Sequence, residues 1–297
     1  MSATLLAEVN EQVQKFWSQL LVDELKENAI LPSLVSADYE GEIKKGGDTV
    51  YVSMVQAAIG SRKPIDANGA HTVITPEKLV TQRVGIAADQ LFEASFELDD
   101  LIGLQTQLGD PAGVSKIRAA LMKGIELQIN DYLYSLVSPS TSAPDHSIAS
   151  NSDYNFAALM ADRLRAAQAK WPDDERYLLL DPSYMNDFLT DAKNTSSDYV
   201  GDAPLIGGKK PYYRSGFWIM EDNSSAMSRL SPTAATADLA IAFHKSFMYL
   251  VHQTQANVVV TDLRAGNKRG YTITAELIGG AKLGLQGNVK HMVNYNS

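Results

Sequence analysis

The sequence predicts an α+β fold with a mixed or antiparallel sheet, and three observations carry this prediction. Apolar side chains alternate with a period of two over residues 50–55, which is the pattern of a β-strand. Apolar residues recur every three or four positions over residues 111–137, which is the pattern of an α-helix. From residue 176 onward, short apolar strands dominate. The 297 residues, 45% of them hydrophobic, suffice for a buried core and favour two lobes over one.

Residues 4–28 predict an amphipathic helix near the N-terminus. Leucine, valine and aromatic residues fall at helical spacing, with charged residues on the other side. Pro32 biases the residue before it away from the helical region, so the helix should end just ahead of it. Its apolar side includes Phe16 and Trp17, which a solvent-exposed helix would not need, so this side requires a covering surface.

Residues 39–88 predict a long β-hairpin. Extended runs at residues 50–55, 71–75 and 79–84 flank a segment rich in turn formers, residues 60–69. Arms of about 12 residues would reach roughly 40 Å, which is longer than an ordinary strand. An isolated two-stranded ribbon is marginal in water, so we expect the hairpin to project from its lobe and to lie on a neighbouring copy.

Helices dominate the middle of the chain. We expect a short helix around residues 89–101, and a helix over residues 111–137 that would run about 40 Å at 1.5 Å per residue. Asn151, Ser152 and Asp153 are candidate caps for a further helix, which ends before Pro172.

The remainder predicts an α/β segment followed by strands. A buried strand at residues 176–181 leads into a helix through Met185 and Leu189. Further strands are expected at residues 217–220, 239–243, 258–260, 271–278 and 283–289.

Composition excludes several functional classes. The net charge is −9, so the chain as a whole does not attract phosphate backbones and we expect no direct nucleic-acid binding. An acidic wall would nonetheless suit a container for DNA, because a basic wall would hold the polymer. The chain has no cysteine, which excludes disulfides and thiol nucleophiles. Neither a signal peptide nor an apolar run of roughly 20 residues is present, so we expect a soluble protein made in the cytoplasm, without membrane association.

The sequence contains none of the common catalytic, cofactor or metal-binding motifs. The five histidines form no metal-binding spacing, and the acidic clusters at residues 99–100 and 173–175 are interpreted as solvated charge. Gly279 and Gly280 do not fit a dinucleotide-binding motif, so we interpret them as a close backbone approach between strands. We therefore predict neither catalytic residues nor cofactors.

The order of these features resembles the major capsid proteins of tailed bacteriophages, and the resemblance covers nearly the whole chain. Four segments look similar to stretches of that family: Gly46-Gly47-Asp48-Thr49-Val50-Tyr51-Val52, Tyr177-Leu178-Leu179-Leu180-Asp181-Pro182-Ser183-Tyr184, Leu239-Ala240-Ile241-Ala242-Phe243-His244-Lys245 and Ile278-Gly279-Gly280-Ala281-Lys282-Leu283.

The resemblance implies a domain organisation for this chain. It implies an N-terminal arm at residues 1–37, an extended loop formed by the β-hairpin of residues 38–88, and a peripheral domain at residues 89–172 with the spine helix 111–137. An α/β axial domain would follow at residues 173–252. Residues 253–297 would supply C-terminal strands that return to the peripheral domain and close the axial domain.

The resemblance also implies a function and partners. Copies would assemble as hexamers and pentamers into an icosahedral shell around double-stranded DNA, in the cytoplasm of a bacterial host. The N-terminal helix with Phe16 and Trp17, and the loop tip with Arg62, Lys63 and Asp66, would contact neighbouring copies. Partners would include a separate scaffolding protein, a portal protein and decoration proteins. Some relatives cross-link their subunits through Lys and Asn, and neither position can be matched here.

Three other functions stay open at this stage. An encapsulin-type protein compartment shares the fold but loads enzymes in place of DNA. A soluble enzyme with an unrecognised site would stop at a small oligomer. A sugar-binding module is the third, with Trp171, Tyr212, Tyr213 and Trp218 as candidate stacking residues that are more readily explained as core or loop anchors.

Overall fold

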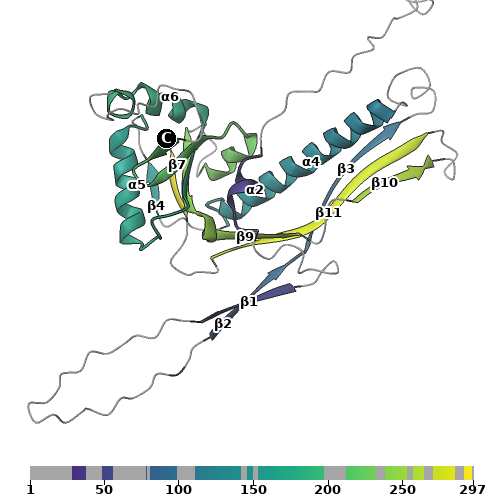
Figure 1. Ribbon diagram of the computed structural model, residues 1–297, viewed down its shortest axis with the longest axis horizontal. Coiled ribbons are helices and arrows are strands. Elements are labelled where there is room, and N and C mark those ends of the chain that lie inside the picture. Colours follow the sequence, from purple (N-terminus) through teal and green to yellow (C-terminus); the bar gives the residue numbers. More distant parts are fainter. Residues whose placement is uncertain are drawn as a thin grey trace, which may run out of the picture. The chain divides into compact units, whose positions relative to one another are not determined.

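The computed structural model describes residues 29–37, 49–55, 78, 81–98, 111–141, 146–149, 153–196, 212–231, 238–252, 257–263, 270–284 and 291–295 (Figure 1). Its elements in chain order are α2 Leu31–Leu34, β1 Thr49–Val55, β2 Thr81–Ala87, β3 Gln90–Leu98, α4 Pro111–Val137, β4 His146–Ala149, α5 Phe156–Gln168, β5 Arg176–Leu180, α6 Pro182–Thr190, α7 Ala192–Thr195, β6 Tyr212–Arg214, β7 Phe217–Glu221, the 3-10 helix η3 Ser225–Leu230, β8 Leu239–His244, the 3-10 helix η4 Lys245–Phe247, β9 Met248–His252, β10 Asn257–Asp262, β11 Tyr271–Leu283 and β12 His291–Tyr295. No helix in these ranges is long and apolar enough to cross a membrane.

The chain forms two compact units. Unit 1 includes Phe92–Gln128 and Ala256–Glu276, whereas unit 2 includes Asn28–Leu91, Ile129–Gln255 and Leu277–Ser297. Each unit is built around a sheet, and both sheets combine strands that are distant in the sequence. The α+β class is therefore confirmed.

Unit 2 is organised around a mixed six-stranded sheet in the order β4-β12-β8-β5-β7-β6. The pairs β4–β12 and β5–β7 are parallel, whereas β12–β8, β8–β5 and β6–β7 are antiparallel. Strand β8 is buried along its whole length, as expected for a strand in the interior of a sheet.

Helices α5 and α6 cover one face of this sheet. Leu178, Leu180, Phe217 and Ile219 point to that face and share a core with buried residues of both helices, among them Phe188. A capping side chain lies at the start of each helix. Asn155 caps α5 by accepting from the N–H groups of residues 157 and 158, and Asp181 caps α6 by accepting from the N–H of residue 184.

The C-terminal part of α4 belongs to unit 2 and is fixed by polar contacts. The hydroxyl of Tyr134 donates to Oδ2 of Asp222 at 2.6 Å, and both residues are almost fully buried. One turn earlier, the Asn130 amide donates to Ser224 Oγ at 2.9 Å, and Asp131 accepts two hydrogen bonds from Arg229. These contacts hold the segment after β7 against α4.

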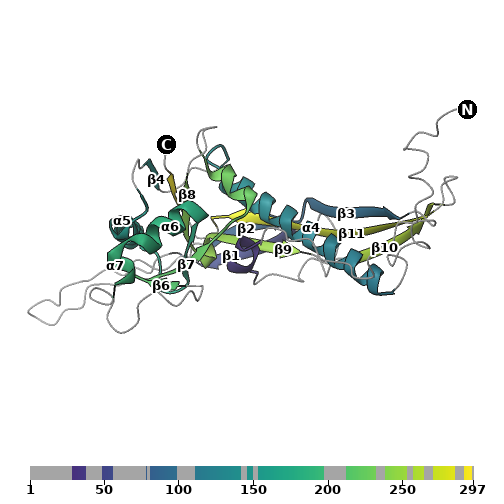
Figure 2. The same cartoon turned by 90° about the horizontal axis from the view of Figure 1, so that it is seen from above.

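Unit 1 contains the sheet order β10-β11-β3, and the N-terminal part of α4 runs along it (Figures 1 and 2). Phe92 of β3, Ile273 and Ala275 of β11, and Leu121 and Ile125 of α4 are buried. The side chain of Gln128 donates to the carbonyl of Glu93 at 2.8 Å, and thereby joins the helix to the sheet.

Several predicted elements are confirmed. Helix α4 has the predicted bounds, 111–137, and β5, α6, β7, β8 and β10 match the predicted strands and helix within one or two residues. The two described arms of the hairpin pair antiparallel from Thr49↔Ala87 to Val55↔Thr81. The amphipathic helix expected at residues 4–28 and the run at 71–75 lie outside the described residues.

Other predictions are wrong. The expected helix at 89–101 is largely the strand β3, because pairing with β11 outweighs the helix-forming Leu, Glu and Ala residues in this segment. The cap of α5 is Asn155, which lies beyond the three candidates at 151–153. The expected division into strands at 271–278 and 283–289 is wrong at its break, since β11 runs without interruption from Tyr271 to Leu283, and residues 285–289 lie outside the described residues. Strands β4, β6, β9 and β12 were not predicted.

Candidate interaction surfaces

Two residues of the acidic cluster at 173–175 form ion pairs. Asp173 pairs with Arg176 at 2.8 Å and Glu175 pairs with Lys245 at 3.1 Å, at the start of β5. Among the described residues, no group of three or more His, Cys, Asp and Glu side chains could hold a metal ion.

An open depression of about 410 Å³ lies beside the starts of α5 and α7, lined in part by Asp153, Asp187 and Asp191. Hydrogen bonds from the N–H groups of Phe156 and Lys193 lower the pKa of Asp191, as expected for a helix cap. Burial and the neighbouring Asp153 raise the pKa of Asp187. Helix capping thus explains the lowered pKa of Asp191.

Asp162 is a fully buried carboxyl group of α5. Its Oδ2 accepts from the Tyr154 hydroxyl and from the Asn294 amide, both at 2.6 Å. Burial raises its pKa to about 6 despite these two hydrogen bonds. The three residues join α5, the segment before it and β12, and so the group ties distant parts of unit 2 together.

The β1–β2 ribbon has one buried face and one exposed face. Val50, Val52 and Ile86 are buried against Tyr249 and Val251 of β9, in a cluster that also includes Ala88 and Ile278. The sequence predicts that the hairpin lies on a neighbouring copy. Along the described strands its own chain supplies that surface, so only the outward face of the ribbon is left for a partner.

Tyr51 dominates the outward face of the ribbon. It is 57% exposed and pairs in register with Gly85, which has no side chain to push the ring away. A Cβ atom on Gly85 would lie 3.2 Å from Cε1 of the Tyr51 ring, which shows how closely the ring lies over the backbone. The guanidinium of Arg83 lies 4.2 Å from the ring centroid, so the two form a cation–π pair. This pair presents an aromatic and cationic patch to solvent.

A second exposed aromatic group lies at the β6 edge of the six-stranded sheet. Tyr213, Trp218, Tyr177, Phe243 and His291 occupy paired positions on β6, β7, β5, β8 and β12. Tyr213 is 58% and Trp218 39% exposed, whereas Phe243 is fully buried. The rings of Tyr213 and Trp218 are 4.9 Å apart between centroids. These side chains therefore form a row from the buried Phe243 to the exposed pair Tyr213 and Trp218.

Two of the four candidate stacking residues are buried and two are exposed. Trp171 and Tyr212 are buried, as the interpretation of them as core anchors requires, whereas Tyr213 and Trp218 are exposed. An exposed aromatic pair on a rigid sheet is typical of a contact with another macromolecule.

The contact residues predicted from sequence, Phe16, Trp17, Arg62, Lys63 and Asp66, all lie outside the described residues and remain predictions. The structure also shows the exposed pair Tyr51 and Arg83, which sequence reasoning missed. The signal was present: strict alternation over residues 50–52 places Tyr51 on the face opposite Val50 and Val52.

No protein-family model and no curated protein matches the sequence. Solved structures do match. A chain of Mycobacterium phage Che8 is 22% identical and matches over 95% of this chain and 96% of its own, with a TM-score of 0.69. The capsid structure of the cyanophage P-SCSP1u matches over 97% and 94%, with 12% identity and a TM-score of 0.70. The head structure of Helicobacter pylori bacteriophage KHP40 matches over 100% and 99%, with 8% identity and a TM-score of 0.66. The chain therefore has the fold of phage capsid proteins, and the fold expected from the resemblance is confirmed.

Proposed function

We propose that this chain, which has the fold of phage capsid proteins, is a major capsid protein that assembles with copies of itself. Hexamers and pentamers would close into an icosahedral shell around double-stranded DNA. The observation that carries the proposal is the match of fold over at least 94% of both chains in the three structures compared. A shell subunit works through its whole surface, so a match over the whole chain supports this function better than a shared core would.

The described surfaces support assembly over catalysis. Tyr51, with Arg83 beside it, is exposed on the outward face of the ribbon, and Tyr213 and Trp218 are exposed at the β6 edge. Exposed aromatic side chains that lie together favour contact with a partner over exposure to water. The net charge of −9 suits a wall that encloses DNA without binding its sequence. The protein would thus be a structural component of the virion and not an enzyme.

The proposal assigns a role to each part of the chain. Residues 1–37 would be the arm, 38–88 the extended loop, 89–172 the peripheral domain, 173–252 the axial domain and 253–297 the returning strands. A scaffolding protein, a portal protein and decoration proteins would be the partners. Assembly would take place in the cytoplasm of a bacterial host.

Electron microscopy of the purified full chain, alone and with the product of the neighbouring gene, tests the proposal. Closed shells are the expected result, and a small oligomer in both preparations would overturn it. Shells isolated from the natural host should contain DNA. Enzyme cargo in place of DNA would assign the chain to protein compartments of the encapsulin type.

Deletion of residues 60–69 tests the contact proposed for the loop tip. The deleted chain should stay soluble and folded but build no shells, because the tip would have nothing to place on the adjacent copy. A chain that keeps its length but carries alanine at Arg62, Lys63 and Asp66 is the matched variant. Normal shells from the deletion would reject this contact and leave the capsid function standing.

A further inference from the structure

Unit 1 has two layers with outer faces on opposite sides. A Cβ atom on Gly124 of α4 would lie 3.5 Å from the Cβ of Ala94 of β3, so this side of the helix rests on the sheet. Phe92 and Ala94 share that side of β3, because side chains alternate along a strand. Glu93 and Glu97 therefore point away from the helix, and both are exposed.

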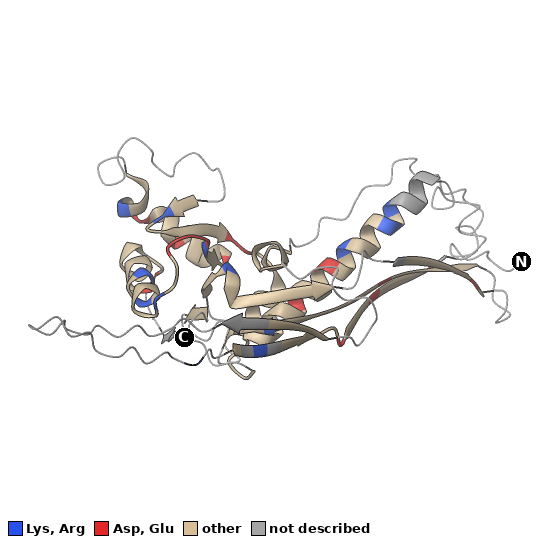
Figure 3. Cartoon of the chain, turned by 60° about the horizontal axis from the view of Figure 1, so that its bottom comes forward, with Lys and Arg blue, Asp and Glu red and all other residues tan. Residues whose placement is uncertain are grey.

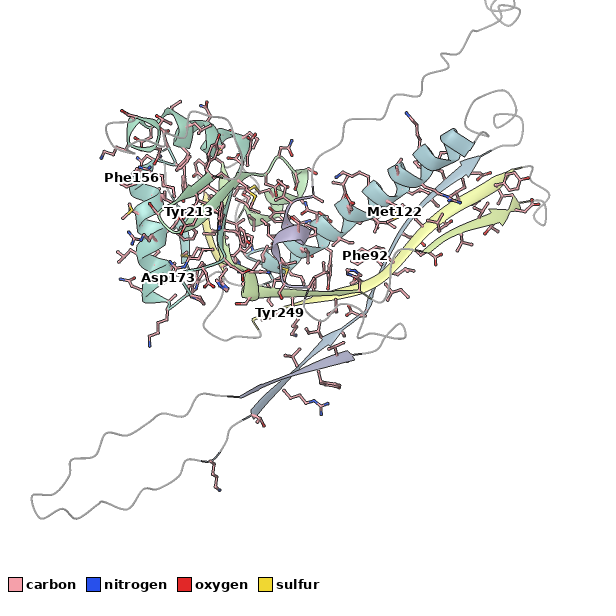
Figure 4. All side chains as sticks on the ribbon, viewed as in Figure 1. Phe92, Met122, Phe156, Asp173, Tyr213 and Tyr249 are labelled. Carbon is pink, nitrogen blue, oxygen red and sulfur yellow. The ribbon has the colours of Figure 1, made fainter. Side chains whose placement is uncertain are left out.

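The outer face of the helix is basic around an apolar centre. Arg118, Met122 and Glu126 follow each other at four-residue spacing and are exposed, Met122 by 37% (Figure 4). Lys116 and Lys123 flank this row, and Lys123 pairs with Glu126 at 3.2 Å. We call these five residues the helix face, which has three cations and one carboxylate.

The outer face of the sheet is acidic around an apolar centre. Glu276 of β11 lies on the side opposite the buried Ala275, and Asn257 pairs with it in register. Val259, two residues along β10, shares this side and is 39% exposed. We call Glu93, Glu97, Glu276 and Val259 the sheet face. The described strands of unit 1 contain neither Lys nor Arg, and Figure 3 shows blue residues on α4 and red residues on the strands.

The two faces are complementary but cannot meet within one copy, because they lie on opposite sides of the same unit. Each combines an exposed apolar side chain with a charged rim, which is the anatomy of a protein interface.

We infer that unit 1 of one copy docks through its helix face on the sheet face of unit 1 in a second copy. The contact is heterologous, so it repeats from copy to copy and generates a ring or a larger assembly. Because copies with a net charge of −9 repel each other overall, a local basic surface is what lets them approach in one orientation. The inference rests on the proposed function, since it names the partner surface for self-assembly.

Charge reversal tests this contact better than salt does, because salt also screens the overall repulsion between copies. The helix variant carries Arg118→Glu and Lys123→Glu, which moves the net charge from −9 to −13. The sheet variant carries Glu93→Lys and Glu97→Lys, which moves it from −9 to −5. Each variant alone should yield at least about tenfold fewer shells than the parent chain, because like charges would face each other across the contact.

The combined chain, with all four substitutions, has the parental net charge and should recover shell yield. Arg163→Glu with Lys170→Glu is the matched control: it also gives −13, from exposed positions in unit 2. It should assemble like the parent. Circular dichroism verifies that every variant is folded.

Parental shell yield from both single-face variants would overturn the inference, and so would failure of the combined chain or of the control. Loss in the control would mean that net charge decides, and failure of the combined chain would mean that the side chains act without pairing. A parent chain that builds no shells under any condition would instead overturn the proposed function.

Discussion

The carbonyl oxygen of Ala87 lies against Gly280: a Cβ atom on that glycine would stand 1.9 Å from it. The atoms of residues 87 and 88 in the way are all backbone, so no side chain can rotate to make room. The base of the β1–β2 ribbon therefore approaches β11 as closely as a bare backbone allows. The close approach expected for this glycine pair is confirmed at Gly280.

Gly280→Ala should displace the base of the ribbon from β11. Overpacking against fixed atoms costs about 3 kcal/mol or more, because the backbone itself must shift. The variant should unfold at a lower temperature, and protease should cut it faster within residues 49–55 and 81–87. Cleavage at the parental rate would mean that the ribbon tolerates the methyl group.

Gly124→Ala is expected to act in the opposite direction. A methyl group there would make an ordinary contact, 3.5 Å from Ala94 Cβ, in the middle of α4. Alanine is favoured over glycine within a helix by about 0.5 to 1 kcal/mol. Thermal unfolding should therefore show a small rise in midpoint. A drop comparable to that of Gly280→Ala would show that helix and sheet are packed more tightly than the contact indicates.

Tyr134→Phe removes the hydroxyl that donates to the buried Asp222. The carboxylate keeps the N–H of Ser224 as a donor to Oδ1 but loses the Tyr134 hydroxyl as a donor to Oδ2. A buried acceptor left short of a donor costs about 1–3 kcal/mol. Urea unfolding of the variant should show this loss. Tyr213→Phe, at an exposed position, is the matched control and should leave stability unchanged within error.

Asp162→Asn should change how stability depends on pH. The pKa of Asp162 is about 6 in the folded chain against an ordinary value of 3.8, so folding takes up a proton between these values. Its contribution to stability is complete below pH 3.8 and is lost as the pH rises through about 6. The lost contribution amounts to at most about 3 kcal/mol.

The substituted amide can keep both hydrogen bonds, because its oxygen can accept from Tyr154 and Asn294. Its NH₂ group would replace Oδ1, which accepts no hydrogen bond from the described residues. Relative to the parent, the variant should therefore gain stability between pH 4.5 and pH 8. Equal differences from the parent at both pH values would show that the carboxyl group titrates normally.

Local sequence was enough to predict the elements whose signal lies in one continuous stretch. Helix α4 carries its periodicity through 27 residues, and Asp181 with Pro182 marks the start of α6. Strands β3 and β12 could not be predicted in this way. β3 is composed largely of good helix formers, and β12 is defined by its partners β4 and β8, which come from far earlier in the chain.

The candidate surfaces show the same limit. Tyr212 and Tyr213 are adjacent and identical in chemistry, yet one is 6% and the other 58% exposed. Pairing of β6 with β7 decides which ring enters the core, since a shift by one residue would exchange them. Sequence alone therefore identified the aromatic segment but could not assign its faces.

Strand β12 also determines when the six-stranded sheet of unit 2 can be completed. Residues 291–295 enter the sheet between β8 and β4, and β4 has no other strand partner among the described residues. Because β12 also supplies Asn294 to Asp162, the sheet and its buried polar group stay open until that stretch has left the ribosome. A growing chain consequently lacks the finished edge of unit 2 until residues 291–295 have been synthesised and have paired with β8 and β4.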